Sequence, residues 1–356
     1  MKQPTTQVYT LRPLEDARWR DLIASHPRSS AFHCNAWLEA LRRTFRFEPI
    51  AFTTSGPHSS LANAVVLCRV DSWITGHRLI SLPLSDHCDP LVDDMEVEQA
   101  ILSSLQREIV RKRLRYAEIR PTREMKTVTE CAYSTLTYCS HRIDLSANID
   151  TLFRRCHKNS TQRKIRRAER EGLTLIKGCT ESILDHFYRL MVLTRRRHNA
   201  PPQPKAWFGN LIDCFGSALT IRLALKHGSP IAGILTLRHK DTLVYKYGCS
   251  DAGFHHFGGM QFLLWDSILE AKREGLWTFD LGRSEWGHPG LIAFKDHMGA
   301  TRSELSYSRL SAGKSPRGAA KPADTARKAR IARLLSLYMP DSAFCRAGEF
   351  VCRHFV

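Results

Sequence analysis

Apolar residues recur along the first half of the chain with the periods of both helices and strands. Four of them lie at intervals of four positions and predict a helix over Glu96–Arg113; they are Val97, Ile101, Leu105 and Ile109. Shorter runs rich in branched aliphatic or alternating residues predict strands at 49–53, 62–70, 77–82, 116–120 and 135–144. The first half is therefore predicted to be a mixed α/β unit that ends near residue 148.

The second half is also predicted to mix helices and strands, and both halves run helix, strands, helix, strand, although no internal repeat is obvious. Helices are predicted over Ile183–Arg197 and Trp207–Phe215, and a hairpin that turns at 227–229 follows the second one. After a strand over Thr242–Cys249, the chain continues with a Gly258-Gly259 turn, an amphipathic helix and strands at 278–281 and 304–310. A strand, a glycine turn, a helix and a strand in this order are suited to hold a phosphate and present an acyl group.

These patterns divide the chain into five parts. We expect an N-terminal extension (1–29), a first α/β unit (30–148), a second unit (149–310), a flexible linker (311–330) and a helical tail (331–356). The linker is rich in Gly, Ala, Pro and Lys and has no core-forming residues, which is typical of disorder. The tail contains two short amphipathic helices separated by Pro340, and these either dock on the main body or lie on a membrane surface.

The charge of the chain points to an anionic ligand. Its 356 residues carry a formal net charge of +18, which favours nucleic acid, an anionic membrane or a phosphorylated substrate without choosing among them. The N-terminal residues lack the apolar core of a signal peptide, and no apolar run approaches the roughly 20 residues that span a bilayer. We therefore expect a cytoplasmic protein, whose tail would be the part that contacts the inner membrane.

The cysteines do not suggest a metal or disulfide framework. The chain has 11 of them but no CxxC pair. One polar loop, LPLSDHCDPL, places Asp86, His87, Cys88 and Asp89 between two prolines, where binding residues often collect. A tetrahedral metal ion would need further ligands from distant segments, so we predict no metal and interpret Cys88 and Asp89 as turn residues. Asp86 and His87 are candidates for binding an acceptor substrate.

Two basic segments form candidate anion-binding surfaces. The first is a predicted helix with six cationic residues, Lys158, Arg163, Lys164, Arg166, Arg167 and Arg170. Its charges form either a solvated face or a wall that holds tRNA or a nucleotide-linked substrate. The second is the arginine triplet 195–197 at the end of a predicted helix. Arginines there stabilise the helix dipole and are also suited to bidentate binding of phosphate, which makes Arg197 a substrate-binding candidate.

The order of elements in the second half resembles the GNAT acyltransferase fold. In that fold, backbone amides between the fourth strand and the next helix hold the pyrophosphate of coenzyme A, and the corresponding turn here is Phe257-Gly258-Gly259-Met260. Glycines allow the backbone to approach an anion closely, and the free N–H groups at the start of a helix point toward it. The resemblance implies that Gly258, Gly259 and Met260 bind acyl-CoA as a co-substrate and that no cofactor is bound permanently.

A more specific resemblance is to the FemAB-like branch, in which two GNAT-type units are fused. It covers about residues 30–310 and depends on the stretches RKIRRAEREGL, LMVLTRRRHNAPPQP, YKYGCSD, FDLGRS and FK…GA. These stretches are similar to the polysaccharide-associated bacterial members. Characterised FemAB proteins move amino acids from aminoacyl-tRNA to cell-wall precursors, and their Phe-Lys pair beside the reacting carbonyl corresponds to Phe294-Lys295. The coiled-coil arm that some members use for tRNA is not evident in this sequence.

Acyl transfer requires a stabilised oxyanion and a group that removes a proton from the acceptor. The resemblance makes Lys295, with Phe294, the candidate for the oxyanion or the donor phosphates, against the alternative of a surface lysine. Alternation along TFDL places Asp280 opposite Phe279 and Leu281, so that it would point outward as a base or as a group that orients the acceptor. A structural pair between Asp280 and Arg283 is the alternative to substrate binding by these two residues.

The remaining candidates have stronger structural alternatives. Tyr245 and Tyr247 are predicted to share one face of a strand, where core packing competes with a substrate-binding role for Tyr247. His198 is either a base or a helix-end residue. No Ser-His-Asp order, HExxH or Walker sequence is present, which argues against hydrolases, zinc proteases and NTPases.

We therefore predict an N-acyltransferase that uses acyl-CoA or aminoacyl-tRNA and acts on an amine or hydroxyl of a cell-envelope or exopolysaccharide intermediate. One alternative is an aminoacyl-tRNA-dependent peptidoglycan aminoacyltransferase. A second alternative, from a different class, is a non-catalytic protein that binds nucleic acid through its basic helix or serves as a scaffold through its tail.

Overall fold

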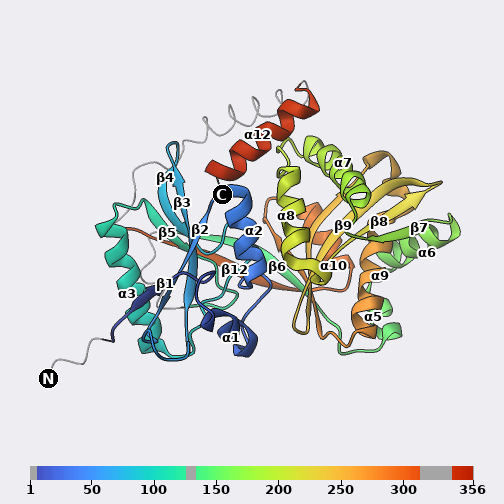
Figure 1. The fold of residues 1–356 in the computed structure, drawn as a ribbon. Coiled ribbons are helices and arrows are strands. Elements are labelled where there is room, and N and C mark those ends of the chain that lie inside the picture. The colour runs from blue at the N-terminus through green and yellow to red at the C-terminus, as the bar shows by residue number, and fades with distance from the viewer. Residues whose placement is uncertain (1–5, 126–133, 313–338, 356) are drawn as a thin grey trace. The chain divides into compact units, whose positions relative to one another are not determined.

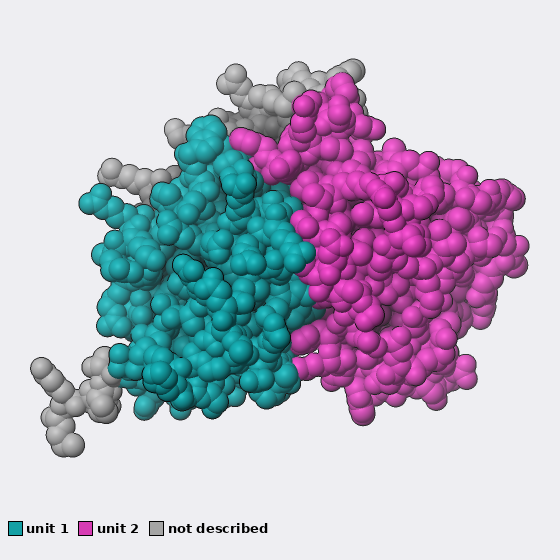
Figure 2. All heavy atoms as spheres, viewed as in Figure 1, with its two compact units in different colours: residues 1–138, 304–319, 351–356 teal, residues 139–303, 320–350 magenta. Residues whose placement is uncertain are grey.

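The computed structural model describes residues 6–125, 134–312 and 339–355. The chain forms two compact units, each assembled from separated segments (Figure 2). Unit 1 comprises residues 1–138, 304–319 and 351–356, and unit 2 comprises residues 139–303 and 320–350. Most of the predicted linker and the first predicted tail helix lie outside the described residues.

Unit 1 is built on a mixed sheet with the strand order β1-β2-β3-β4-β5-β12 (Figure 1). β4 and β5 are parallel, whereas the other neighbouring strands run antiparallel. The strands are β1 (Tyr9–Leu11), β2 (Glu48–Thr53), β3 (Val65–Ser72), β4 (Gly76–Ile80), β5 (Tyr116–Ile119) and β12 (Thr301–Leu310). Its helices are α1 (Arg18–Ser25), α2 (Asn35–Phe45) and α3 (Met95–Arg111).

The predicted four-residue period of α3 corresponds to its buried face. Ile101, Leu105 and Ile109 are fully buried in one cluster. Strand residues Leu67 and Leu79 belong to the same cluster, so the helix covers the sheet with its apolar stripe.

Unit 2 is built on a second series of strands in the order β6-β11-β10-β9-β8-β7. They are β6 (Ser134–Asp144), β7 (Thr174–Gly178), β8 (Leu219–Lys226), β9 (Ser229–His239), β10 (Thr242–Ser250) and β11 (Thr278–Ser284). β10 and β11 are parallel, and β7 to β10 form an antiparallel meander. The helices are α5 (Ile149–Arg155), α6 (Arg163–Arg170), α7 (Glu181–Arg197), α8 (Lys205–Phe215), α9 (Gly259–Arg273) and α10 (Pro289–His297).

Helices α7 and α9 cover opposite faces of the unit 2 sheet. A Cβ added to Gly233 would lie 3.1 Å from the ring of Phe187 on α7, and one added to Gly259 would lie 3.1 Å from Cβ of Ala232. Because neighbouring residues of a strand point to opposite faces, Ala232 and Gly233 place the two helices on different sides. The backbones therefore approach closely on both faces, and the start of α9 is held against β9.

Two local features differ from the sequence-based expectation. The basic segment 158–170 is not one regular helix, because a π-helical turn (Lys158–Gln162) precedes α6. The segment before Gly258 is a 3₁₀ helix, η3 (Ala252–Phe257), where the sequence predicts a loop.

Helix α12 (Asp341–His354) contains the second predicted tail helix, and its first turns pack on unit 2. The Arg196 guanidinium lies 4.6 Å from the ring centre of Phe344 and donates a hydrogen bond to the Met339 carbonyl at 2.6 Å. Among the described residues, no helix combines the length and apolar content required to cross a membrane.

Candidate functional site

The two parallel strands of unit 2 separate soon after they pair. β10 and β11 are in register only from Thr242 opposite Thr278 to Val244 opposite Asp280. Beyond this point β10 remains paired with β9, and β11 continues beside β6, each strand passing through a bulge. The carboxyl ends of parallel strands that separate are a common place for a ligand, because side chains do not fill the space between them.

A cavity of about 270 Å³ lies beside the part of β10 that no longer pairs with β11, and all its lining residues belong to unit 2. We call it the α9 cavity, because the first residues of α9 form one side of it. The remaining lining comes from α6, the end of α7, β9, β10, η3 and α10. The predicted cofactor-binding residues Gly259 and Met260 and the predicted residues Phe294 and Arg197 line this cavity.

The start of α9 is open to an anion. Gly258 adopts a left-handed conformation with φ of 81°, and no side chain caps the helix. A Cβ at Gly258 would lie 2.6 Å from the carbonyl oxygen of Lys164, so only glycine fits between α6 and α9. The first turn of α9 contains no acidic residue. The N-terminal backbone N–H groups therefore keep their full attraction for a negative ligand.

Cationic and neutral nitrogen groups surround this helix end. Lys164, Arg197, His198 and His255 line the cavity, whereas Asp251 is its one acidic lining residue. The Asp251 carboxylate accepts a hydrogen bond at 2.9 Å from the backbone N–H of Gly253, which orients it toward its own loop. The lining is therefore positively polarised, as a phosphate-bearing ligand requires.

The two histidines of the cavity have lowered pKa values. Burial lowers the pKa of His198, and the neighbouring Arg197 and Arg195 lower it further. Burial, Arg197 and Lys164 lower the pKa of His255, whose Nε2 lies 2.8 Å from the Ser250 hydroxyl. Both imidazoles are therefore neutral near pH 7 before an anion enters, and each can accept a proton.

The opposite wall of the cavity is apolar and narrow. Ile231, Tyr245, Met260, Leu291 and Phe294 contribute to it. A Cβ added to Gly248 would lie 1.8 Å from the hydroxyl oxygen of Tyr245, so glycine at this position makes room for the phenol. Burial raises the pKa of Tyr245 far above its usual value, which keeps the hydroxyl protonated.

Lys295 lies behind the cavity wall, beside Phe294. Its side chain is only 3% exposed, and its ammonium donates hydrogen bonds to the carbonyls of Gly282 at 3.0 Å and Arg283 at 2.9 Å. These bonds fasten α10 to the bulge of β11. Lys295 is therefore not the exposed surface lysine of the alternative interpretation.

Asp280 and Arg283 flank the same bulge. The sequence predicts that Asp280 points outward, but its side chain is buried, because residues 279–282 of β11 are buried on both faces of the strand. One carboxylate oxygen accepts a hydrogen bond at 2.7 Å from the backbone N–H of Gly282, and the other lies 3.6 Å from Nε of Arg142. Asp280 thus stabilises the bulge to which Lys295 is bonded.

The sequence-based prediction missed a pair beside Lys295 that joins the buried His141 to the partly exposed Asp296. His141 on β6 is fully buried, and its Nε2 lies 3.1 Å from a carboxylate oxygen of Asp296, which also pairs with Arg302. Burial and the positive charge of Lys295 lower the pKa of His141. The sequence separates His141 and Asp296 by 155 positions, and only the pairing of β6 with β11 reveals that they meet.

Tyr247 has a structural position outside the α9 cavity. A bulge between Tyr245 and Tyr247 turns the two side chains to different surroundings, so the prediction that they share a face is wrong. The Tyr247 hydroxyl accepts a hydrogen bond at 2.8 Å from Nε1 of Trp207, and its ring packs edge-on against Phe208.

The predicted acceptor residues Asp86 and His87 belong to unit 1. The Asp86 carbonyl accepts a hydrogen bond at 2.5 Å from the Tyr307 hydroxyl, and the buried His87 ring packs edge-on against Phe32. Within the described residues, no group of three or more His, Cys, Asp or Glu side chains is arranged to hold a metal ion.

Comparison with known proteins gives a family match for part of unit 2. A family model for the acetyltransferase (GNAT) domain matches residues 155–295, which include the α9 cavity, α10 and most of the unit 2 strands. Residues 155–295 are therefore similar to an acetyltransferase (GNAT) domain. A comparison with curated proteins gives no significant match.

Solved structures extend the likeness of fold to most of the chain. FemX superposes with a TM-score of 0.64 at 16% identity, covering 84% of this chain and 96% of FemX. A tandem GNAT protein from the clavulanic acid biosynthesis pathway gives 0.54 at 12% identity, covering 87% and 99%. The C-terminal domain of a putative lysylphosphatidylglycerol synthetase from Agrobacterium fabrum gives 0.53 at 16% identity, covering 91% and 96%. The predicted likeness to FemAB-like GNAT acyltransferases and the predicted tandem fold are thus confirmed.

Proposed function

We propose that the α9 cavity binds a phosphate-bearing acyl donor and that unit 2 transfers its acyl group to an amine or hydroxyl. The observation that supports this most directly is the uncapped start of α9, which opens into a cavity lined by Lys164 and Arg197. Helix N–H groups, a lysine and an arginine together favour a pyrophosphate over a neutral ligand. Acyl-CoA carries a pyrophosphate that the pantetheine arm joins to its thioester, and aminoacyl-tRNA carries phosphodiesters on the nucleotide that bears its aminoacyl ester.

The parted strands provide the place for the reacting carbonyl. With phosphates at the start of α9, the acyl group would extend past Phe294 toward the point where β10 leaves β11. Backbone N–H groups of β10 that no longer face a partner strand would donate to the carbonyl oxygen as it becomes an oxyanion. This assigns the oxyanion to backbone groups and leaves Lys295 a positioning role through the β11 bulge.

The proton of the acceptor needs a base that is unprotonated at the working pH. In the proposed reaction the acceptor nitrogen or oxygen attacks the carbonyl carbon, its proton passes to a base, and the thiolate or ribose oxygen of the donor leaves. His198 fits this role because it lines the cavity and its pKa is lowered. Asp280 would act indirectly, by fixing the bulge that presents Arg283 to the acceptor.

For the acceptor we propose an intermediate of the cell envelope or of an exopolysaccharide. The fold likeness to FemX and the FemAB-like motifs support this class. The likeness to a putative lysylphosphatidylglycerol synthetase domain is compatible with an acceptor at a membrane. The donor alternatives remain acyl-CoA and aminoacyl-tRNA, and a peptidoglycan aminoacyltransferase is the second candidate function.

Donor binding is tested by calorimetry with coenzyme A, acetyl-CoA and charged tRNA on the full chain. Replacing Arg197 by Met should weaken binding of the true donor about 10-fold, the loss expected for one charge-assisted contact. Arg196→Met is the matched control, because Arg196 is in the same turn but contacts Met339 and Asp341. Equal losses in both variants would contradict the α9 cavity as the donor site. Binding of nucleic acid regardless of acylation, with no binding of coenzyme A, would favour the non-catalytic interpretation.

The role of Lys295 is tested by transfer rates measured beside stability. We expect Lys295→Ala to lower both, because two hydrogen bonds that fasten α10 are lost. Lys295→Arg should recover part of the rate if the positive charge at the bulge is what matters. If Lys295→Ala transfers acyl groups as fast as the unmodified protein, neither a catalytic nor a positioning role survives.

A further inference from the structure

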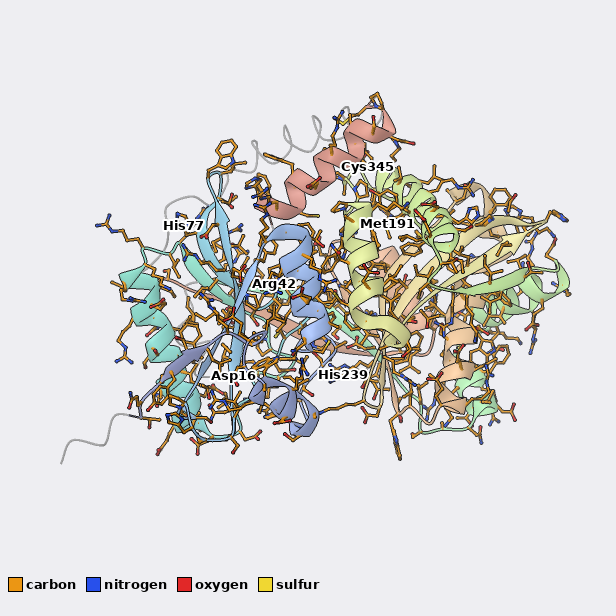
Figure 3. The ribbon with its side chains drawn as sticks, viewed as in Figure 1. Asp16, Arg42, His77, Met191, His239 and Cys345 are labelled. Atoms are coloured by element: carbon orange, nitrogen blue, oxygen red, sulfur yellow. The ribbon has the colours of Figure 1, made fainter. Side chains whose placement is uncertain are left out.

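The hairpin of β3 and β4 in unit 1 ends in an exposed apolar tip. Trp73 is 84% exposed, and Ile74 beside it is also exposed. Large apolar side chains at the end of a turn contribute nothing to the core, and a tryptophan that is this open is uncommon on a soluble surface. His77, labelled in Figure 3, belongs to the same hairpin. Its Nδ1 lies 2.7 Å from a carboxylate oxygen of Asp71 at the base of the turn.

The end of the chain is fastened to this turn. His354 is buried, and its Nδ1 lies 2.9 Å from the Ser72 hydroxyl. Its carbonyl accepts hydrogen bonds from the Thr75 hydroxyl at 2.7 Å and from the Arg78 guanidinium at 2.8 Å. Its ring also lies 6.1 Å from that of Trp73. These contacts fix residues 351–355 beside the hairpin tip.

The fastened segment adds its own apolar side chains to the surface. Phe355 is 54% exposed and Val351, one helical turn earlier, is exposed as well. The backbone N–H of Phe355 donates to the Val351 carbonyl at 2.9 Å, so both lie on the last turn of the chain. We call Trp73, Ile74, Val351 and Phe355 the tip patch.

Cationic side chains surround the tip patch. Arg115 donates a hydrogen bond to the Thr75 carbonyl at 3.3 Å, and the exposed Arg353 lies on the same helical turn as Phe355. Arg69 stands on β3 and pairs with Asp71, the carboxylate nearest to the turn. Arg69 is offset by Asp71 and lies opposite Glu48 on β2. Arg115 and Arg353 therefore leave the rim positive, in agreement with the net charge of +18.

We propose that the tip patch inserts into the interfacial region of an anionic lipid bilayer. Tryptophan and phenylalanine partition into this region, and arginines at the rim would meet the lipid phosphates. The charge complementarity selects an anionic bilayer rather than a neutral one. The contact is made by a hairpin and the chain end together, rather than by the tail alone. It does not depend on the proposed acyl transfer, although it would bring that reaction to a membrane-borne acceptor.

The test is flotation of the full chain with vesicles of phosphatidylcholine alone or with 40% phosphatidylglycerol. We expect binding to the anionic vesicles, weakened by 0.5 M salt, and at least a 10-fold loss of partitioning in Trp73→Ala/Ile74→Ser. Trp277→Ala is the matched control, because Trp277 is 63% exposed at a connection in unit 2, outside the tip patch. This variant should bind the vesicles as the unmodified protein does. Phe355→Ser should give an intermediate loss. Brominated lipids should quench fluorescence of the unmodified protein more than that of Trp73→Phe.

Three outcomes would overturn the proposal. One is equal binding of Trp73→Ala/Ile74→Ser and Trp277→Ala. Another is equal binding to neutral and anionic vesicles. A third is a change of oligomeric state in the Trp73 variant without vesicles, which would identify the patch as a contact between copies. Acyl transfer to a soluble acceptor, measured on the same variants, separates a failure of this proposal from a failure of the proposed function.

Discussion

Helices α3 and α9 occupy equivalent positions in the two units, but the first turns of the two helices have opposite electrostatic environments. Each helix connects two parallel strands that pair over only three positions, β4 with β5 in unit 1 and β10 with β11 in unit 2. The carboxylate of Asp94 caps α3, accepting hydrogen bonds from the N–H groups of Glu96 and Val97, and acidic residues follow in the first turn. Helix α9 begins at Gly258 with neither a capping side chain nor an acid.

The space beside each helix follows the same contrast. In unit 1, Arg120 reaches back from the end of β5 and donates hydrogen bonds to the carbonyls of Leu82 and Ser85. The loop before α3 is bridged to this arginine through the backbone of Cys88 and is largely buried. In unit 2, the corresponding space is the α9 cavity. The same arrangement of a helix between two parallel strands is therefore filled and capped by a carboxylate in unit 1, whereas in unit 2 it is open to an anion. For this reason we propose that unit 2 binds the donor.

The largest effect on stability is expected when a side chain is added at Gly258, where the backbone of α6 lies close to the start of α9. Gly258→Ala should lower the free energy of unfolding by about 3 kcal/mol, because left-handed backbone costs a residue with Cβ about 1–2 kcal/mol and the clash with the Lys164 carbonyl adds to it. Gly275→Ala is the control at the other end of α9. It has φ of 72° but no atom within 4 Å of the added Cβ, so about 1 kcal/mol is expected.

Chemical denaturation of the two variants measures this difference directly. If Gly258→Ala and Gly275→Ala lose the same stability, the close approach of α6 to α9 is not what requires glycine. The steric difference proposed between the starts of α3 and α9 would then be wrong. The difference in charge between the two helix starts would not be affected.

Giving α9 the charge of α3 should abolish donor binding. Met260→Glu places a carboxylate in the first turn of α9, as Glu96 is in α3. Repulsion of the donor phosphates should weaken binding about 100-fold, while the helix itself gains about 0.5 kcal/mol from its dipole. Met260→Gln is the control for size. Calorimetry with coenzyme A and a thermal melt separate the two effects, and unchanged affinity in the Glu variant would show that the anion binds elsewhere.

The reciprocal change in unit 1 should affect stability alone. Asp94→Ala removes the cap of α3 and should cost about 1 kcal/mol of unfolding free energy, with no effect on donor affinity. Asp94→Asn, which keeps an acceptor for the helix N–H groups, should recover most of the loss. A weaker donor affinity in Asp94→Ala would mean that unit 1 takes part in donor binding, against the assignment to unit 2.

Much of this frame follows from local patterns in the sequence. The four-residue period of α3 and the hairpin of β8 and β9 depend on contacts within short segments, so their positions agree with prediction. The glycine pair before α9 was also recognisable, because a tight backbone approach and a helix start both favour glycine there.

The side-chain geometry of the site could not be obtained in this way. A bulge in β10 reverses the alternation on which the orientation of Tyr247 was based, and no local sequence feature marks it. Asp280 is buried because both faces of β11 are covered, which depends on elements distant in the sequence. The burial of Lys295 and its neighbour His141 depends on which strand pairs with β11, a long-range choice. Where orientation depends on register between distant strands, the sequence alone leaves it open.

The smallest expected effect tests the protonation state of His255 in the α9 cavity. Burial, Arg197 and Lys164 lower the pKa of His255, so the unfolded chain binds more protons and stability falls as the pH drops below 6.5. A bound phosphate favours the protonated imidazole and raises its pKa, so binding takes up a proton and donor affinity increases as the pH falls from 7.5 toward 6. His255→Gln should reduce this increase about 3-fold and flatten the acid loss of stability. Because the donor's own phosphate titrates in both proteins, the difference between their affinity profiles reports His255, and parallel profiles would remove this histidine from the anion site.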